Sequence, residues 1–264
     1  MIFVCHLTSS FMSFGGINNM TEQNEMNIIE HLSELRKRLI ITAVFFILFF
    51  IVGFVFAKDV YYFFKSDIDF PLHITGISDT LRIYIKIASI VALVGTIPVL
   101  SLQLWLFVRP GLTSKERKAT LRYIPAVVFL FVLGLVFGYL IFVKFIMPFL
   151  MGLNDEMFTE IFTVEKYFGF MFRIVVPFAF IFEIPIVTMF LTSLGLLSPK
   201  SLRNMRKYAY FGLLILGGII TPPDIFLQLI VAIPLFLLYE VSIYSSSIAY
   251  RSRERRQRAF MEGK

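Results

Sequence analysis

The sequence predicts an all-α integral membrane protein with six transmembrane helices, and three observations lead to this prediction. First, 58% of the 264 residues are hydrophobic and the mean hydropathy is +0.80, more apolar mass than a soluble domain of this length can bury. Second, the apolar runs are continuous, whereas the strands of an outer-membrane barrel alternate. Third, positive charges collect between alternate runs, as they do in helical membrane proteins.

Four apolar runs are long enough to span a bilayer, which takes about twenty residues. They cover residues 39–57, 87–107, 124–143 and 170–194. Two further runs, 208–220 and 225–239, are short and are joined only by the turn TPPD at 221–224. At about 1.5 Å per residue the first of them reaches roughly 20 Å, against a hydrocarbon core of about 30 Å. The short pair therefore predicts a locally thinned bilayer or a polar concavity lined by protein.

Prolines within the apolar runs predict kinked helices that form a concave wall. They are Pro98, Pro177, Pro185 and Pro234. The plainer interpretation is that proline is commoner in membrane helices than in soluble ones.

The distribution of Lys and Arg predicts that both termini lie in the cytoplasm. Eighteen of the 25 such residues lie before the first run, between the second and third, between the fourth and fifth, or after the sixth. Connections rich in Lys and Arg stay on the cytoplasmic side. This topology and anionic lipid explain the net charge of +7, so the charge gives little reason to expect nucleic-acid binding.

The chain divides into four predicted segments. Residues 1–19 are expected to be a disordered extension or the product of an upstream start, and residues 20–38 a cytoplasmic amphipathic segment. Residues 39–243 form the membrane domain and residues 244–264 a basic cytoplasmic tail. Two outer loops, 58–85 and 144–169, are polar enough to cover the outer mouth of the domain.

Glu183 is the one carboxylate within the six apolar runs. Such a group costs about 2.5–3.5 kcal/mol at the centre of a membrane helix, so it should face protein or water and is a functional candidate. Pro185 leaves the carbonyl of Ile181 without its usual donor, and a protonated Glu183 or a water molecule could supply one. The alternative is a neutral glutamic acid that only holds helices together.

Three other polar residues accompany the apolar runs. Gln228 could share a polar pocket with Glu183, while Gln103 lies near the cytoplasmic end of the second run. Hydrogen bonds between helices would explain either glutamine equally well. Asp224 stands where a carboxylate caps the sixth helix favourably.

Glu34 and Glu116 both lie on the predicted cytoplasmic face amid positive charge. A carboxylate that is not neutralised locally can receive a guanidinium through two hydrogen bonds. From spacing alone, an ordinary pair of Glu34 with Arg38 at i, i+4 is the favoured interpretation.

Signals of enzymes, metals and cofactors are absent from the sequence. The three histidines lie outside the apolar runs, and the HExxH, P-loop and GxSxG motifs do not occur. The only cysteine is Cys5, so no internal disulfide can form. We therefore expect a protein that is not an enzyme, has no cofactor or metal, and draws any energy for transport from outside the chain.

Four sequence blocks, in order and on the predicted topology, resemble the TatC subunit of the twin-arginine protein translocase. They are HLSELRKRL at 31–39, WLFVRPGLTSKER at 105–117, FEIP at 182–185, and TPPD at 221–224 with Gln228. The resemblance covers about residues 28–243 and implies a glove-like scaffold in a bacterial cytoplasmic membrane. It implies a receptor for signal peptides with two adjacent arginines that serves export of folded proteins by the proton-motive force. The implied partners are these peptides, small single-span subunits of the TatA or TatB type, and further copies of the chain.

The resemblance also assigns roles to particular residues. Glu34 and Glu116 would receive the arginine pair, with Arg36 and Phe107 as supporting contacts. The polar positions of the membrane concavity or of a partner contact would be Glu183, Gln228 and Gln103, and the outer side would be shaped by Pro71 and Asp224.

Two rival interpretations remain. A small secondary transporter would use Glu183 as its proton or cation carrier, but the lone buried carboxylate and the absence of an internal repeat count against it. A purely structural assembly factor is the other. A transporter should tolerate neutral residues at Glu34 and Glu116, whereas a twin-arginine receptor should not.

Overall fold

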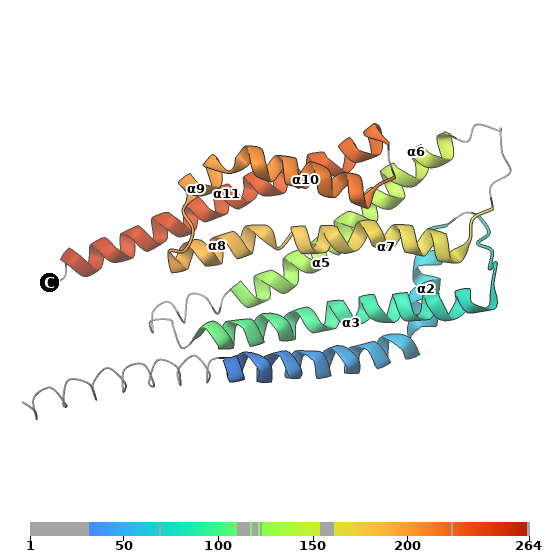
Figure 1. The fold of residues 1–264 in the computed structure, drawn as a ribbon, viewed down its shortest axis with the longest axis horizontal. Coiled ribbons are helices and arrows are strands. Elements are labelled where there is room, and N and C mark those ends of the chain that lie inside the picture. Colours follow the sequence, from blue (N-terminus) through green and yellow to red (C-terminus); the bar gives the residue numbers. More distant parts are fainter. Residues whose placement is uncertain are drawn as a thin grey trace, which may run out of the picture.

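The computed structural model describes residues 32–68, 70–109, 117, 121, 123–153, 161–222 and 224–262. Across these residues the regular structure is helical, apart from a single β-bridge (Figure 1). Five helices are long and apolar enough to cross a membrane: Leu32–Val55, Ile77–Val108, Tyr123–Gly152, Val164–Leu194 and Ile225–Arg255. The predicted all-α membrane fold is confirmed: within the described ranges five helices are candidate spans, and the helix over the predicted short run 208–220 has only 15 residues.

The first membrane helix, Leu32–Val55, runs without a break through the predicted boundary at residue 39. Only 6% of its most apolar window is buried, so most of its surface is left for lipid. It packs on α3 (Ile77–Val108) at two glycines, where a Cβ on Gly53 would lie 2.8 Å from Val91 and one on Gly95 would lie 2.6 Å from the ring of Phe49. Small residues allow this close approach of two helices.

The centre of the domain is the contact between α5 (Tyr123–Ile141) and α7 (Val164–Ile181). A Cβ on Gly134 of α5 would lie only 2.7 Å from the Cα of Ala179 of α7, so glycine is needed there. α5 continues through a π-helical turn, η2 (Phe142–Ile146), into α6 (Met147–Gly152). Fully buried aromatic rings fill the surrounding core: Phe131, Phe142, Phe168 and Phe178.

A helix break separates α7 from α8 (Ile184–Leu194), and Glu183 lies in it. Pro185 explains the break, because its ring nitrogen cannot donate a hydrogen bond to the carbonyl of Ile181. The other prolines that were expected to kink helices lie inside helices that stay continuous: Pro98 in α3, Pro177 in α7, and Pro234 in α11.

The last two helices differ in length, and this corrects the prediction that both are short. After α9 (Pro199–Asn204), α10 (Arg206–Ile220) has 15 residues and reaches about 22 Å, but α11 (Ile225–Glu262) has 38 residues and reaches about 57 Å. The apolar run ends at Tyr239, but the backbone hydrogen bonds of a helix do not require apolar side chains. The predicted basic tail therefore continues α11 as far as Glu262.

The two predicted outer loops are partly helical, which is a second correction. α2 (Ala57–Lys65) occupies part of the first loop, α3 begins at Ile77, and α7 begins at Val164. These helices extend beyond the apolar runs because polar residues near a bilayer surface can still be helical. Between the helices, the N–H of His73 donates to the carbonyl of Phe162 at 2.8 Å, and the N–H of Val164 donates to the carbonyl of His73 at 3.0 Å.

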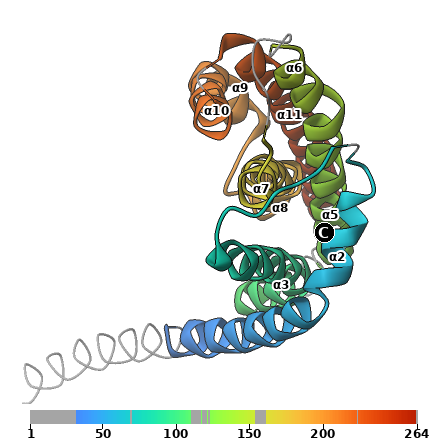
Figure 2. The same ribbon diagram turned by 90° about the vertical axis from the view of Figure 1, so that its right-hand side faces the viewer.

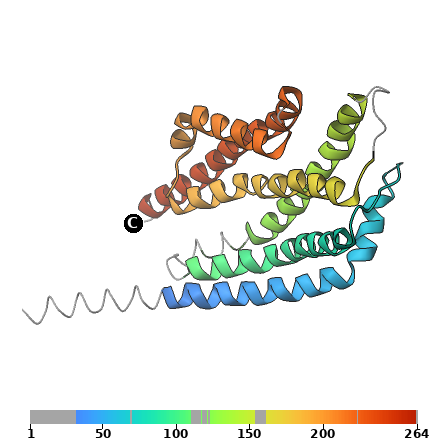
Figure 3. The same cartoon turned by 45° about the vertical axis from the view of Figure 1, so that its right-hand side comes forward.

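The helices form an arc when they are viewed end-on (Figure 2). The first helix and α3 lie at one end of the arc, α9 and α10 lie at the other, and α7 and α8 lie between them. Figure 3 shows α10 running back along α11 on the side away from α3. The concave shape that the sequence predicted is therefore present in the fold.

Candidate functional site

Glu34, Arg38 and Gln103 meet where the first helix and α3 have their ends side by side, and we call them the Glu34 cluster. The Nε atom of Arg38 donates to Oε1 of Glu34 at 3.2 Å, and the Nη2 atom forms an ion pair with the same oxygen. The Nη1 atom of Arg38 donates to Oε1 of Gln103 at 3.3 Å. One guanidinium is thus held between a carboxylate and an amide oxygen from two helices.

The Glu34 cluster is more enclosed than an ordinary surface ion pair. The side chain of Arg38 is 18% exposed and that of Glu34 is 33% exposed. The i, i+4 pair that spacing favoured does form, and α3 completes it by supplying Gln103. Because partial burial lowers the local dielectric, a guanidinium held here interacts more strongly than one in open water.

Other residues assigned to the same face lie around the Glu34 cluster. Arg36 is exposed on the first helix, and Phe107 lies one turn beyond Gln103 on α3. At the end of α3 the guanidinium of Arg109 lies 5.6 Å from the ring centre of Trp105. Glu116, the second predicted acceptor, lies outside the described residues.

Glu183 has no partner among the described residues. Both oxygens of its carboxyl group are buried and neither makes a hydrogen bond. Of the two donors suggested for the free carbonyl of Ile181, a protonated Glu183 or a water molecule, Glu183 does not make this hydrogen bond in the structure. An uncompensated carboxyl group in a membrane helix is costly, so this position remains a candidate for contact with water or another protein.

Gln228 does not share a pocket with Glu183, although the sequence allowed this. Its Nε2 atom donates to the carbonyl of Leu214 at 3.0 Å and so joins α11 to α10. The hydroxyl groups of Thr192 and Ser246 lie 2.7 Å apart, and this contact sets α8 beside α11 in parallel. At that offset of 54 residues, Glu183 is level with residue 237, about 14 Å along α11 from Gln228. The structure therefore separates Gln228 from Glu183, and Gln103 belongs to the Glu34 cluster.

Asp224 and Pro71 lie away from the Glu34 cluster, beside connections between helices. Oδ1 of Asp224 accepts a hydrogen bond from the N–H of Leu227 at 3.0 Å, so the predicted helix cap is confirmed. Pro71 is exposed, two residues before the β-bridge at His73. Within the described ranges, no group of three or more His, Cys, Asp or Glu side chains is arranged to hold a metal ion.

Comparison with known proteins shows the family to which the chain belongs. A family model described as Sec-independent protein translocase protein (TatC) matches residues 30–234, which include all four sequence blocks. The chain belongs to the TatC family. The resemblance that the sequence blocks indicated is confirmed, and membership of this family supports a role in protein translocation over the solute-transporter interpretation.

Individual TatC proteins resemble the chain over nearly their whole length. A Sec-independent protein translocase protein TatCd from Bacillus subtilis (strain 168) is 42% identical over 238 residues, which are 90% of this chain and 98% of the relative. A TatC from Halalkalibacterium halodurans is 40% identical over 244 residues, 91% of this chain and 96% of the relative. The crystal structure of a twin-arginine translocase receptor, TatC, matches with a TM-score of 0.74 at 35% identity, covering 83% of this chain and 99% of that one.

The structure also shows a charged group that sequence reasoning passed over. Arg82 and Lys86 of α3 both pair with Glu165 of α7, at 3.3 Å and 3.6 Å. In the sequence, Arg82 and Lys86 are simply two of the seven Lys and Arg outside the cytoplasmic connections. Their helical spacing within mostly apolar segments was the signal that could have revealed them.

Proposed function

We propose that this chain is the signal-peptide receptor and core membrane subunit of a twin-arginine translocase, which exports folded proteins by means of the proton-motive force. The observation that supports this best is the Glu34 cluster, which already binds a guanidinium with a carboxylate and an amide oxygen. The cluster lies at the end of the domain that the distribution of Lys and Arg assigns to the cytoplasm.

Binding would proceed by exchange of guanidinium groups. An arginine of the signal peptide would replace Arg38 on Glu34, and the long side chain of Arg38 would turn towards water. The net cost of the exchange is small, because one charge-assisted guanidinium–carboxylate pair on Glu34 replaces another. Lysine cannot replace arginine equally, since an ammonium lacks the planar fork that pairs with a carboxylate.

The second arginine of the pair requires a second acceptor. Side chains of neighbouring residues in an extended peptide point to opposite sides, so two adjacent arginines cannot both reach one carboxylate from the same side. Glu116 follows α3 in the chain and would be this acceptor. Arg36 and Phe107 would contact the peptide beside the arginines.

The remaining assigned residues would serve the membrane part of the function. Glu183 and Gln228 would face small single-span partner subunits or the water of the concavity, and Pro71 and Asp224 would shape the outer side. The short α10 would thin the bilayer beside it. The chain would act in the bacterial cytoplasmic membrane, with both termini on the cytoplasmic side and in an assembly with further copies.

Binding of a twin-arginine signal peptide to the purified protein tests this proposal. Glu34→Gln and Glu116→Gln should each weaken binding about tenfold or more, because each removes a charge-assisted hydrogen-bond acceptor worth roughly 1.5–3 kcal/mol. A twin-lysine peptide should bind weakly to every variant. Glu240→Gln is the matched control, because Glu240 also holds an arginine, Arg206 at 2.6 Å, but lies outside the Glu34 cluster.

Equal binding of both peptides to all variants would contradict the receptor assignment. The transporter alternative would then be tested by Glu183→Gln, which should abolish solute-coupled proton movement if Glu183 is the carrier.

A further inference from the structure

Five charged side chains gather between α3 and α7, at the end of the domain opposite the Glu34 cluster. We call them the basic cluster: Arg82, Lys86, Glu165, Lys166 and Arg173. A cavity of about 630 Å³ is lined by four of them, Lys86, Glu165, Lys166 and Arg173, together with Gly169, Phe170 and Phe172. A Cβ on Gly169 would lie 3.0 Å from the Nζ atom of Lys86, so glycine leaves room for that ammonium group.

The charges of the basic cluster do not balance internally. Arg82 and Lys86 share one ion-pair partner, Glu165, and Arg82 also interacts electrostatically with Asp79. Lys166 and Arg173 are both exposed, and neither forms an ion pair within the described part of the chain. Four cations against these two carboxylates still leave a positive cavity, so its natural ligand is an anion.

The position of the basic cluster along the helices sets the depth of this anion. The helix pair Val164–Leu194 is 31 residues long, or about 46 Å, against a hydrocarbon core of about 30 Å. If the pair is centred, the core begins roughly five residues after Val164, so Glu165 and Lys166 lie at headgroup level and Arg173 lies about 5 Å below it. Long basic side chains at this depth extend back towards the headgroups.

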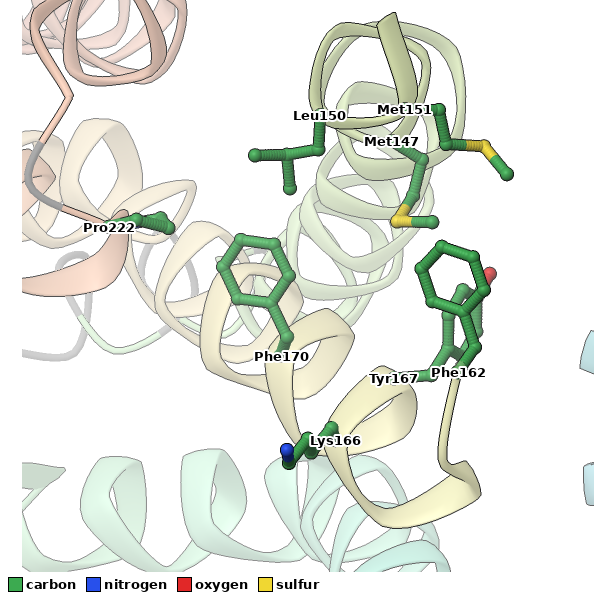
Figure 4. Close-up of a pocket in the computed structure, with 8 residues that line it drawn as sticks. All are labelled: Met147, Leu150, Met151, Phe162, Lys166, Tyr167, Phe170 and Pro222. Atoms are coloured by element: carbon green, nitrogen blue, oxygen red, sulfur yellow. The ribbon is translucent and has the colours of Figure 1, made fainter. Parts of the chain in front are cut away.

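An apolar cavity adjoins the basic one. It favours a phospholipid over a free anion as the ligand, because only the phospholipid has an apolar part. Its volume is about 310 Å³, and it is lined by Met147, Leu150, Met151, Phe162, Lys166, Tyr167, Phe170 and Pro222. Figure 4 shows apolar side chains from α6 and α7 around this space, with Lys166 at its edge. Lys166 and Phe170 line both cavities, so a phosphate in the first would place the start of an attached acyl chain beside Phe170, at the edge of the hydrocarbon core.

We infer that the basic cluster and the adjoining apolar cavity form a binding site for one anionic phospholipid, with its phosphate against Lys86, Lys166 and Arg173 and an acyl chain beside Phe170. Anionic headgroups bind basic pockets between membrane helices in this way. The site would anchor the end of the domain opposite the Glu34 cluster to the neighbouring leaflet.

Retention of lipid by the purified full-length chain, measured by native mass spectrometry, tests the inference. The wild type should retain phosphatidylglycerol about tenfold more strongly than phosphatidylcholine, because its headgroup keeps an uncompensated negative charge. The Lys166→Gln/Arg173→Gln double variant should lose most of this preference. Since neither side chain makes an ion pair in the described residues, the variant should still fold, and its melting temperature checks this.

The matched control is Lys144→Gln. Lys144 is an exposed cation of η2 that lies about as far from the middle of its helix as Arg173 does, and it lines neither cavity. This variant should retain phosphatidylglycerol as the wild type does. Equal retention of the two lipids by the wild type, or an unchanged preference in the double variant, would overturn the inference. Complete displacement of lipid by excess inorganic phosphate would assign the site to a free anion and would also overturn it.

Discussion

Glu34 and Glu183 are both glutamates of membrane helices, but one carboxyl group is paired with a cation and the other is unpaired among the described residues. The carboxylate of Glu34 holds a guanidinium and is partly open to water. The carboxyl group of Glu183 is buried, with neither oxygen hydrogen-bonded in the described part of the chain. The first holds a cation, whereas the second has no hydrogen-bond partner among the residues that the structure describes. This difference underlies our proposal that the paired carboxylate takes part in signal-peptide binding and the unpaired one in assembly with partners.

The surroundings of the two residues explain this difference. Glu34 lies where two helix ends meet, and a side chain from each helix reaches the guanidinium of Arg38. Glu183 lies in a helix break that packs against α5, where a Cβ on Gly134 would come within 2.9 Å of Phe182. Among the described residues, no group donates a hydrogen bond to the carboxyl oxygens of Glu183.

The strongest test of this packing is Gly134→Leu. Because a Cβ there would lie 2.7 Å from backbone atoms of α7, overpacking should destabilise the fold by about 1–3 kcal/mol or prevent folding. The yield of folded protein and its melting temperature in detergent measure the effect. Gly212→Leu is the control, since no atom lies within 4 Å of a Cβ at Gly212. Equal tolerance of both leucines would contradict the described contact between α5 and α7.

Glu183→Leu should raise stability by about 1 kcal/mol, because it removes a buried polar group that makes no hydrogen bond. Glu34→Leu should not raise stability, since it leaves the guanidinium of Arg38 with a single acceptor, Gln103. Chemical unfolding of the two variants in the same detergent compares them directly. A loss of stability in Glu183→Leu would show that the carboxyl group has a partner, and the contrast between the two glutamates would fail.

Arg38→Gln should tighten binding of a twin-arginine peptide by up to about fivefold. The reason is that the resident guanidinium no longer competes for Glu34, and such a pair is worth about 0.2–1 kcal/mol. Titration of labelled peptide gives the dissociation constant, and Arg206→Gln, which breaks the similar pair with Glu240, serves as control. Weaker binding in Arg38→Gln would mean that Arg38 positions Glu34 for the peptide instead of competing with it.

The sequence predicted the membrane class, the four long spans, the shortness of the helix before the TPPD turn, and the Asp224 cap. These features depend on local composition and spacing. The end of α11 was missed, because an apolar run marks contact with lipid and does not mark the end of hydrogen bonding along a helix.

Contacts between distant parts of the chain could not be predicted from spacing. Arg38 and Gln103 are 65 residues apart, and only the packing of the first helix on α3 brings them together. The separation of Gln228 from Glu183 likewise depends on the register of α11 beside α8, which is set by Thr192 and Ser246. The basic cluster requires the approach of α3 to α7, so its residues looked like scattered charges in the sequence.

The most direct test of the central claim is a double-mutant cycle between Glu34 and the arginines of the signal peptide. Binding would be measured for wild type and Glu34→Gln with peptides that carry Arg-Arg, Arg-Lys, Lys-Arg and Lys-Lys. If Glu34 receives one guanidinium, a single peptide position should show a coupling energy of about 1.5–3 kcal/mol with Glu34, and the other should show almost none. Coupling near zero at both positions would contradict the account, because Glu34 would then bind neither arginine.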